Sequence, residues 1–342
     1  MEERALSKQI RYYEVDGYRI PIVSLRSIRV RSEEGIQALA QEIKKVCEEV
    51  GLFYIEDHGV SEMHLRLVEE AVHDFFSLPT SEKMKILISR SPYHRGYVPP
   101  EEENAYGIDV KDIKEVFDMA LELPLDDPDV IAGKWFHGPN AWPEALPHFK
   151  PTMLWLYREW LRVCENISEL FAIALDLPRG FFIEKSQRPL AQLRAAMYPK
   201  QPQNRNDSAI GCGLHTDYGV VTIIWQVDEP GLEIRDVNGR WINAPKIPGT
   251  FICPLGDAMG IWTNGHWPAT PHRVVNRGEK VRHSLAFFYD QDYECLMQPL
   301  SRFVTTERPS QYKPTTMAEH VKRGFDGTFS YRANKVEGGA LS

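Results

Sequence analysis

The stretch from Gly213 to Gln226 constrains the fold of this chain more than any other. Its second half, from Val220 onward, is rich in β-branched residues and predicts a buried strand. His215 and Asp217 stand two residues apart where the chain enters that strand. In extended backbone, residues i and i+2 point to the same side, so an imidazole and a carboxylate would face one point. The pair predicts part of a metal site that needs a third ligand.

His272 is the best candidate for that third ligand, because it opens another short β-branched run. Two histidines and one carboxylate on one face of a six-coordinate metal leave three positions open, which is the arrangement used by non-haem Fe(II) oxygenases. In a later predicted strand, 281–289, Arg282 and Ser284 share one face. They form a carboxylate clamp, since a guanidinium group matches a carboxylate bidentately. His266 and His283 are weaker alternatives as ligands: the first lies in a predicted turn, and the second alternates to the face opposite Arg282.

These residues, together with several earlier segments, resemble the isopenicillin N synthase-like family of iron- and 2-oxoglutarate-dependent dioxygenases. The similarity covers nearly the whole chain. It includes the segments Ile20-Pro21-Ile22, Gly51-Leu52-Phe53-Tyr54, Phe75-Phe76-Ser77-Leu78-Pro79, Arg95-Gly96-Tyr97 and Met197-Tyr198-Pro199. The resemblance implies a mainly β fold with flanking helices, built on a double-stranded β-helix (jelly-roll) core.

The same resemblance assigns roles within the site. It implies three ligands for Fe(II): His215, Asp217 and His272. It also implies that Arg282 and Ser284 bind the distal carboxylate of 2-oxoglutarate, with O2 as the other cosubstrate. Tyr198 is expected to donate its phenol to that carboxylate. Many relatives carry asparagine two positions before this tyrosine, where the chain has Ala196. The oxoacid pocket is therefore expected to depend mainly on Arg282, Ser284 and Tyr198.

Region 88–147 is rich in proline, is the least regular part of the sequence and predicts long loops, which in a compact domain are usually functional. By analogy with the family, these loops should help to roof the active site. Arg95, Tyr97 and Phe117 are therefore expected to contact the primary substrate. Phe288 is expected to do so as well, because it shares a strand face with Arg282.

Periodicity predicts the remaining elements. Apolar residues at helical spacing predict helices over 32–50, 61–78 and 149–175. Short strands separated by turns, including one over 259–262, are typical of an antiparallel β core. With 342 residues, of which 43% are hydrophobic, we expect a single catalytic domain. It comprises a support region of helices, loops and edge strands (1–190), the jelly-roll core with the metal site (191–300) and a C-terminal segment with a tail (301–342).

Composition limits the partners and the compartment. The net charge of −8 is spread without long blocks, and no basic patch indicates a nucleic acid or an anionic membrane. The sequence has no apolar run of about 18 residues, and the start of the chain lacks the features of a signal peptide. The five cysteines are far apart, as in reduced cytosolic proteins. We expect a cytoplasmic enzyme acting on a small molecule, in an oligomeric state that stays open.

The leading hypothesis is an oxidoreductase of specialised (secondary) metabolism. It would oxidise a small organic substrate by C–H abstraction, giving hydroxylation, desaturation or cyclisation, and release succinate and CO2 from 2-oxoglutarate. One alternative is an oxidase resembling isopenicillin N synthase, which shares the iron ligands but does not use 2-oxoglutarate. Another is a zinc hydrolase that uses the same three ligands to activate water, which gives the Arg282–Ser284 clamp no purpose. A third is a non-catalytic jelly-roll binding protein.

Overall fold

Two β-sheets form the core of the protein. The structure is a computed structural model that describes residues 9–103, 112–200, 211–236, 239–276 and 280–332. From one edge to the other, the large sheet contains nine strands: β1 (Ile10–Val15), β2 (Tyr18–Ser24), β3 (Leu52–Glu56), β11 (Phe251–Pro254), β8 (Val221–Gln226), β13 (Arg282–Tyr289), β6 (Gln192–Tyr198), β5 (Glu115–Ala120) and β4 (Gly96–Val98). The small sheet contains β10 (Trp241–Asn243), β9 (Leu232–Arg235), β12 (His272–Val274) and β7 (Cys212–His215).

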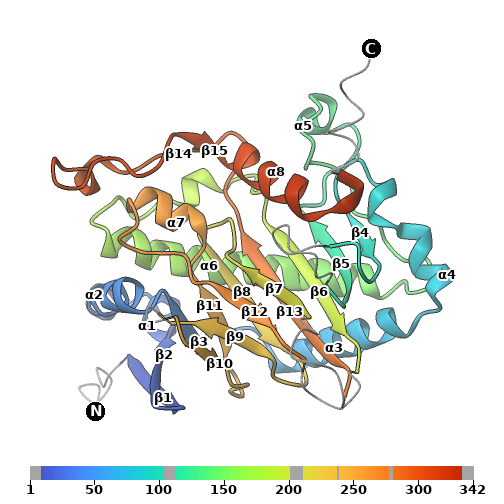
Figure 1. Ribbon diagram of the computed structural model, residues 1–342, viewed down its shortest axis with the longest axis horizontal. Coiled ribbons are helices and arrows are strands. Elements are labelled where there is room, and N and C mark those ends of the chain that lie inside the picture. Colours follow the sequence, from blue (N-terminus) through green and yellow to red (C-terminus); the bar gives the residue numbers. More distant parts are fainter. Residues whose placement is uncertain (1–8, 104–111, 201–210, 237–238, 277–279, 333–342) are drawn as a thin grey trace.

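Helices flank this β core (Figure 1). Their bounds are α1 (Arg26–Arg29), α2 (Glu33–Glu49), α3 (Glu62–Ser77), α4 (Thr80–Lys83), α5 (Pro128–Ile131), α6 (Phe149–Ala174), α7 (Asp257–Trp262) and α8 (Met317–Thr328). A short pair of strands, β14 (Leu296–Met297) and β15 (Thr315–Thr316), precedes α8. The predicted fold class, mainly β with flanking helices, is confirmed.

The long helices begin at the residues that their sequences favour. The side chains of Ser32 and Ser61 accept hydrogen bonds from backbone N–H groups in the first turns of α2 and α3, which satisfies donors that a helix start leaves unpaired. At α8, Thr316 and Glu319 form a reciprocal capping box. The three helices predicted from periodicity in the first half of the chain are thus present as α2, α3 and α6.

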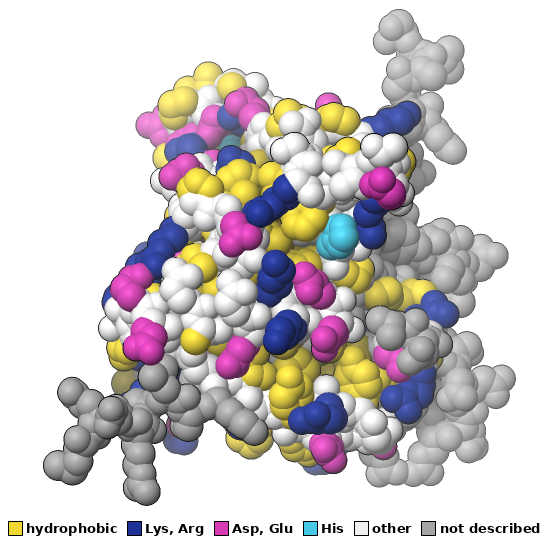
Figure 2. Space-filling view, turned by 90° about the vertical axis from the view of Figure 1, so that its left-hand side faces the viewer, with side chains coloured by type: hydrophobic (Ala, Val, Ile, Leu, Met, Phe, Trp, Pro, Cys, Tyr) yellow, Lys and Arg dark blue, Asp and Glu magenta, His cyan; other side chains and the backbone are white. Residues whose placement is uncertain are grey.

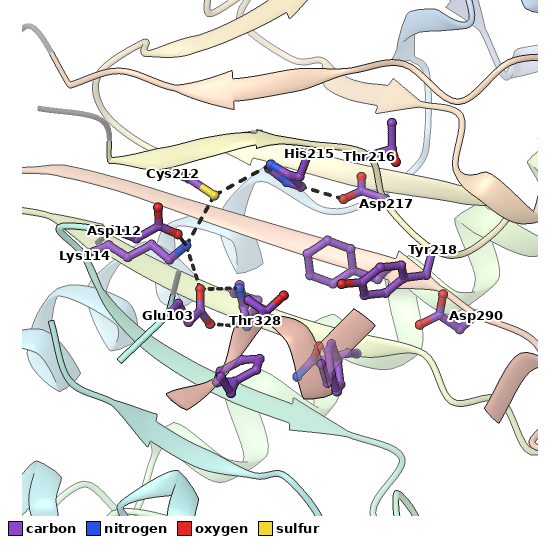
Figure 3. Close-up of a pocket in the computed structure, with 15 residues that line it drawn as sticks. Glu103, Asp112, Lys114, Cys212, His215, Thr216, Asp217, Tyr218, Asp290 and Thr328 are labelled. Carbon is purple, nitrogen blue, oxygen red and sulfur yellow. Dashed lines mark hydrogen bonds and ion pairs between the residues drawn. The ribbon is translucent and has the colours of Figure 1, made fainter. Parts of the chain in front are cut away.

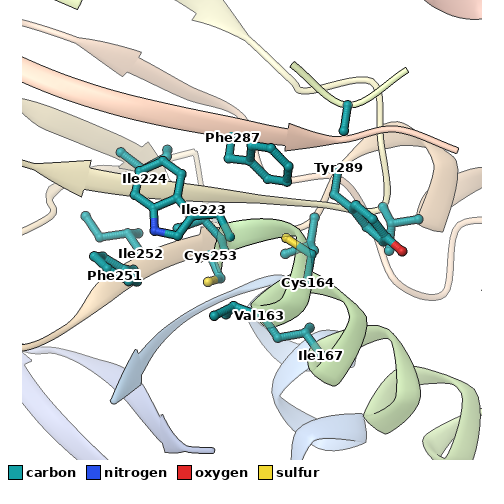
Figure 4. Close-up of a cluster of buried hydrophobic side chains, with 14 of the residues drawn as sticks. Val163, Cys164, Ile167, Ile223, Ile224, Phe251, Ile252, Cys253, Phe287 and Tyr289 are labelled. Atoms are coloured by element: carbon teal, nitrogen blue, oxygen red, sulfur yellow. The ribbon is translucent and has the colours of Figure 1, made fainter. Parts of the chain in front are cut away.

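Helix α6 packs on the outer face of the large sheet and completes the core there. Figure 4 shows Val163, Cys164 and Ile167 of α6 facing side chains of three strands. These side chains include Ile223 of β8, Cys253 of β11 and Phe287 of β13, all of which are fully buried. Burial of this apolar surface stabilises the contact by roughly 25 cal/mol per Å².

Strand β13 has two faces with different tasks. Arg282, Ser284, Ala286 and Phe288 line a pocket between the two sheets, whereas Phe287 faces α6 (Figure 4) and the ring of His283 contacts His73 of α3. The alternation follows from the two-residue period of a strand. One element therefore carries both polar groups of a site and part of the core behind it.

Two sequence predictions about local structure are wrong. Residues 259–262 are the end of helix α7 and not a strand, because a short apolar run has no periodicity that separates the two. Region 88–147 is less loop-like than predicted, since it contains β4 and β5, which form one edge of the large sheet. The support region thus extends the core sheet directly.

The surface carries charges of both signs. On the face shown in Figure 2, Lys and Arg side chains are interspersed with Asp and Glu side chains, with apolar side chains between them. Within the described residues, none of the helices combines the length and the apolar character needed to cross a membrane.

Candidate active site

The structure brings together the three predicted metal ligands. His215 ends β7 and His272 begins β12, and the two are register partners in the small sheet. Asp217 follows two residues after β7. Its Oδ1 lies 3.7 Å from Nε2 of His215, and its Oδ2 lies 3.7 Å from Nε2 of His272. One ligand atom from each residue lies within 4.8 Å of the others, so the three can hold one metal ion.

Hydrogen bonds orient both imidazoles toward this point. Nδ1 of His215 lies 2.8 Å from the carbonyl oxygen of Gly213, and Nδ1 of His272 lies 2.9 Å from that of Thr270. Because Nδ1–H donates to a carbonyl, Nε2 keeps its lone pair for a metal. Burial lowers the pKa of His272, which favours the neutral form that binds metals.

The electrostatics of Asp217 also fit a cation. The side chain is buried, and its Oδ2 has no hydrogen-bond partner among the described residues. A buried carboxylate oxygen without a partner is unfavourable unless a cation compensates it. A divalent metal held between Asp217 and the two Nε2 atoms would do so.

The loop after Asp217 depends on a glycine. A Cβ atom on Gly219 would lie 2.4 Å from the carbonyl oxygen of Tyr289 and 2.4 Å from Oδ1 of Asp290. Such distances are far below van der Waals contact, so any side chain would push the loop away from the end of β13. The glycine therefore keeps the metal-site loop against that strand.

A pocket of about 510 Å³ is lined by His215 and His272 and contains the predicted carboxylate clamp of Arg282 and Ser284, so we call it the oxoacid pocket. Arg282 is fully buried there. Its Nη1 donates to Oγ of Ser284 at 3.2 Å, its Nη2 donates to Oε1 of Gln226 at 3.2 Å, and its guanidinium carbon lies 4.8 Å from the ring centre of Tyr198. It forms no ion pair with a described carboxylate, and burial lowers its pKa. A buried cation of this kind requires an anionic partner.

Gln226 is a site residue that sequence reasoning missed. Besides accepting from Arg282, it accepts from the backbone N–H of Leu232 and donates to the carbonyl of Ala244. It therefore fixes the guanidinium group to the backbone of the small sheet. The signal was available, since Gln226 is a polar residue at the end of a β-branched strand.

A second pocket, of about 640 Å³, also has His215 in its lining (Figure 3). Four aromatic residues line it: Tyr218, Phe288, Phe325 and Phe329. Phe325 belongs to α8, and Phe329 directly follows it. The C-terminal segment thus forms one wall, which is a tertiary contribution that the sequence did not reveal.

Charged groups of this second pocket form a network from which one carboxyl is excluded. Lys114 lies 2.7 Å from Glu103 and 2.8 Å from Asp112, and Arg194 lies 2.8 Å from Glu103. Asp290 is buried and forms no ion pair with any described residue, and its Oδ1 has no hydrogen-bond partner there. Burial, with contributions from Asp217 and Asp257, raises the pKa of Asp290 to about 8.

Comparisons with known proteins decide the family. The model of the 2OG-Fe(II) oxygenase superfamily matches residues 189–291, and the model described as non-haem dioxygenase in morphine synthesis N-terminal matches residues 20–145. The chain belongs to the 2OG-Fe(II) oxygenase superfamily. It is an Fe(II)- and 2-oxoglutarate-dependent dioxygenase, as predicted, and the zinc-hydrolase alternative is set aside.

Individual relatives agree with this assignment. The oxygenase is 34% identical over 302 residues to a homoarginine-6-hydroxylase of Arabidopsis thaliana, covering 83% of this chain and 88% of the relative. It is 32% identical over 310 residues to a 2-oxoglutarate-dependent dioxygenase of Monascus ruber, covering 88% and 92%. The fold also matches the crystal structure of a full-length Neurospora crassa protein in complex with alpha-KG, with a TM-score of 0.79, 22% identity and coverage of 92% and 98%.

Three of the four predicted substrate contacts of the oxygenase lie outside both pockets. Arg95 is fully buried and donates to the backbone carbonyls of Tyr93, His94 and Phe136. Tyr97 donates to Glu115. Phe117 packs among core aromatic rings. The prediction treated region 88–147 as a roof of loops, whereas these positions belong to or adjoin sheet strands. Phe288 does line both pockets.

Phe117 offers a test of this correction. Its ring centre lies 5.1 Å from that of Phe75 and 4.9 Å from that of Phe149. We expect Phe117→Ala to lower the free energy of unfolding by about 3–5 kcal/mol, because it leaves a cavity in the core. The exposed Leu125→Ala should change it by less than about 0.5 kcal/mol. Urea unfolding measures both, and a large rise in substrate KM without loss of stability would restore the contact role.

Proposed function

We propose that His215, Asp217 and His272 hold Fe(II) in this oxygenase. The support is the convergence of the two Nε2 atoms with an Asp217 oxygen that has no partner among the described residues. Three protein ligands on one side leave the remaining positions for the cosubstrates. Bound Fe(II) would supply the binding of O2 and of the oxoacid, and the oxidation of an unactivated C–H bond.

We propose further that Arg282, Ser284 and Tyr198 bind the distal carboxylate of 2-oxoglutarate. Arg282 would supply the charge, with Ser284 and Tyr198 as hydroxyl donors beside it. Gln226 would hold the guanidinium group in place before the oxoacid arrives, which lowers the entropy lost on binding. The apolar residues Ile224 and Leu232 of the same pocket would exclude water around the buried carboxylate.

For the primary substrate, we propose a small molecule with a cationic nitrogen group, such as a guanidinium or an ammonium. The observation that carries this proposal is Asp290, a buried carboxyl in the aromatic pocket that pairs with no described cation. Aromatic ring faces attract cations, and a bound cation would favour the ionised form of Asp290, whose pKa burial raises. The Arabidopsis relative is named a homoarginine-6-hydroxylase, and homoarginine carries such a group.

The proposed reaction couples hydroxylation of this substrate to conversion of 2-oxoglutarate to succinate and CO2, with O2 as the oxidant that gives one oxygen atom to the substrate and one to succinate. Residues of the second pocket would orient the substrate so that a C–H bond near the cationic group faces the triad, since correct placement accounts for much of an oxygenase's selectivity. We also infer that the enzyme works in the cytoplasm as one catalytic unit, which its free cysteines support.

Substrate-stimulated succinate release tests the substrate class. We expect homoarginine and related guanidino or amino compounds to raise the rate of succinate formation in the iron-loaded enzyme. Homocitrulline, whose ureido group is neutral and similar in shape, should stimulate it at least about tenfold less, since a charged hydrogen bond is worth about 1.5–3 kcal/mol. Equal stimulation by the neutral compound, or stimulation only by neutral aromatic compounds, would contradict the proposal.

Asp290→Asn should raise the KM of a cationic substrate by roughly 10- to 100-fold, because the neutral amide cannot pair with the charge. Turnover of 2-oxoglutarate without substrate should stay unchanged in the same variant. Glu294→Gln is the control, since its side chain is 77% exposed and lies beyond the same strand. A KM that does not change in Asp290→Asn would remove this residue from substrate binding.

A further inference from the structure

A second cluster of two histidines and one carboxylate lies outside the site described above. His73 of α3, Asp228 just after β8 and His283 of β13 each offer one ligand atom within 4.8 Å of the others. The ring centres of His73 and His283 are 4.5 Å apart with an interplanar angle of 58°. The corresponding values for His215 and His272 are 4.2 Å and 57°. The two clusters therefore have nearly the same imidazole geometry.

The carboxylate of this cluster is held in place for a ligand. Oδ1 of Asp228 accepts the backbone N–H groups of His283 and Glu229, both at 2.7 Å. Oδ2 is at hydrogen-bond distance, 2.7 Å, from Nδ1 of His283 and lies 3.6 Å from Nε2 of His73. One carboxylate oxygen is thus fixed by the backbone, and the other contacts both rings, so a bound metal would replace the proton between Asp228 and His283.

His73 supplies the second observation. Its Nε2 atom is buried and has no hydrogen-bond partner among the described residues, although the side chain as a whole is 40% exposed. An imidazole nitrogen buried without a partner is unfavourable, and here it points at a carboxylate oxygen just beyond hydrogen-bond range. The exposed edge of the ring leaves a path for an ion and for a water ligand.

The distances suit a transition metal. Metal–nitrogen and metal–oxygen bonds of about 2.0–2.2 Å at angles of 90–109° separate ligand atoms by about 2.8–3.6 Å. Of the observed separations from Oδ2, 2.7 Å lies just below this range and 3.6 Å lies at its upper end. Small rotations of the two rings would bring both nitrogens into it.

We propose that His73, Asp228 and His283 form a second metal site, the outer metal site, which takes Zn²⁺ with water as a further ligand. Zinc suits two imidazoles and one carboxylate. A bound ion ties α3 to the ends of β8 and β13. It sits behind the oxoacid clamp, since His283 lies between Arg282 and Ser284 in the sequence and faces away from them.

Metal titration of the full-length, metal-free protein tests this proposal, with Co²⁺ as the probe and equilibrium dialysis and visible absorption as readouts. We expect the wild-type chain to bind two equivalents of Co²⁺. His73→Gln should bind one, with affinity at the lost site reduced at least tenfold. His64→Gln, a change of the same kind on the same helix, should still bind two. Circular dichroism checks that both variants are folded.

Replacing one ligand of the proposed iron site distinguishes Co²⁺ binding at that site from binding at the outer metal site. Asp217→Ala should bind one equivalent of Co²⁺, and Asp217→Ala combined with His73→Gln should bind none. If the wild-type chain binds no more Co²⁺ than His73→Gln does, the outer metal site does not exist. If only the equivalent of Co²⁺ that depends on Asp217 is missing, the result contradicts the proposed iron site and not the outer metal site. Should Asp217→Ala fail to fold, the comparison of wild type with His73→Gln decides by itself.

Discussion

His272→Ala is expected to abolish turnover of 2-oxoglutarate and to weaken Fe(II) binding at the active site by at least about three orders of magnitude. The variant removes one of three protein ligands. Loss of a group that only hydrogen-bonds to a ligand already lowers metal affinity roughly 10- to 100-fold, so loss of a ligand itself should have a larger effect. The lost Nε2 atom is one of those that face Asp217. Anaerobic absorption of the enzyme–Fe(II)–2-oxoglutarate complex measures the binding, and succinate formation measures the turnover.

His266→Ala is the matched control for this experiment. His266 lies six residues earlier in the same segment, is exposed and contacts the ring of Phe303. Its replacement should leave iron binding and succinate formation at wild-type levels. Wild-type absorption and turnover in His272→Ala would exclude this histidine as an iron ligand.

Arg282→Gln is expected to raise the KM for 2-oxoglutarate by roughly 30-fold or more. Truncating one partner of a buried charge pair costs about 2–5 kcal/mol, and Arg282 has no exposed surface over which water could replace it. Arg282→Lys should fall between the variant and the wild type, because an ammonium keeps the charge and loses the bidentate geometry. Succinate formation at varied 2-oxoglutarate concentrations measures the effect.

The specificity of this effect identifies the ligand of Arg282. The KM for the primary substrate should change little in Arg282→Gln. If that KM rises while the 2-oxoglutarate requirement stays constant, Arg282 binds the primary substrate, as in an oxidase of the isopenicillin N synthase type. Arg240→Gln is a suitable control, since the side chain of Arg240 is 53% exposed and does not line the oxoacid pocket.

The parts of the site that could be predicted from the sequence are those set by local geometry. His215 and Asp217, like Arg282 and Ser284, are two residues apart in extended chain, so their common direction follows from the period of a strand. His272 needed the additional assumption that two separate β segments converge. The structure pairs it directly with His215.

The other residues of the two pockets could not be predicted, because their positions depend on tertiary contacts that no pattern in a single sequence indicates. Asp290 looks like any carboxyl after a strand, and its isolation appears only once the partners of Lys114 and Arg194 are known. Phe325 and Phe329 reach the pocket because α8 folds back over the core. Arg95 was misjudged for the opposite reason, since a charged residue in a proline-containing stretch without apolar periodicity gives no sign of complete burial.

The two-sided use of β13 limits how its length can change. Arg282, Ser284 and Phe288 face the pockets, while Phe287, on the alternate face, packs toward α6. Because side chains alternate, inserting or deleting one residue early in this strand would turn the clamp toward α6 and send the ring of Phe287 into the oxoacid pocket. Single-residue insertions and deletions within β13 should therefore eliminate activity and folding together, whereas point substitutions can affect either one alone.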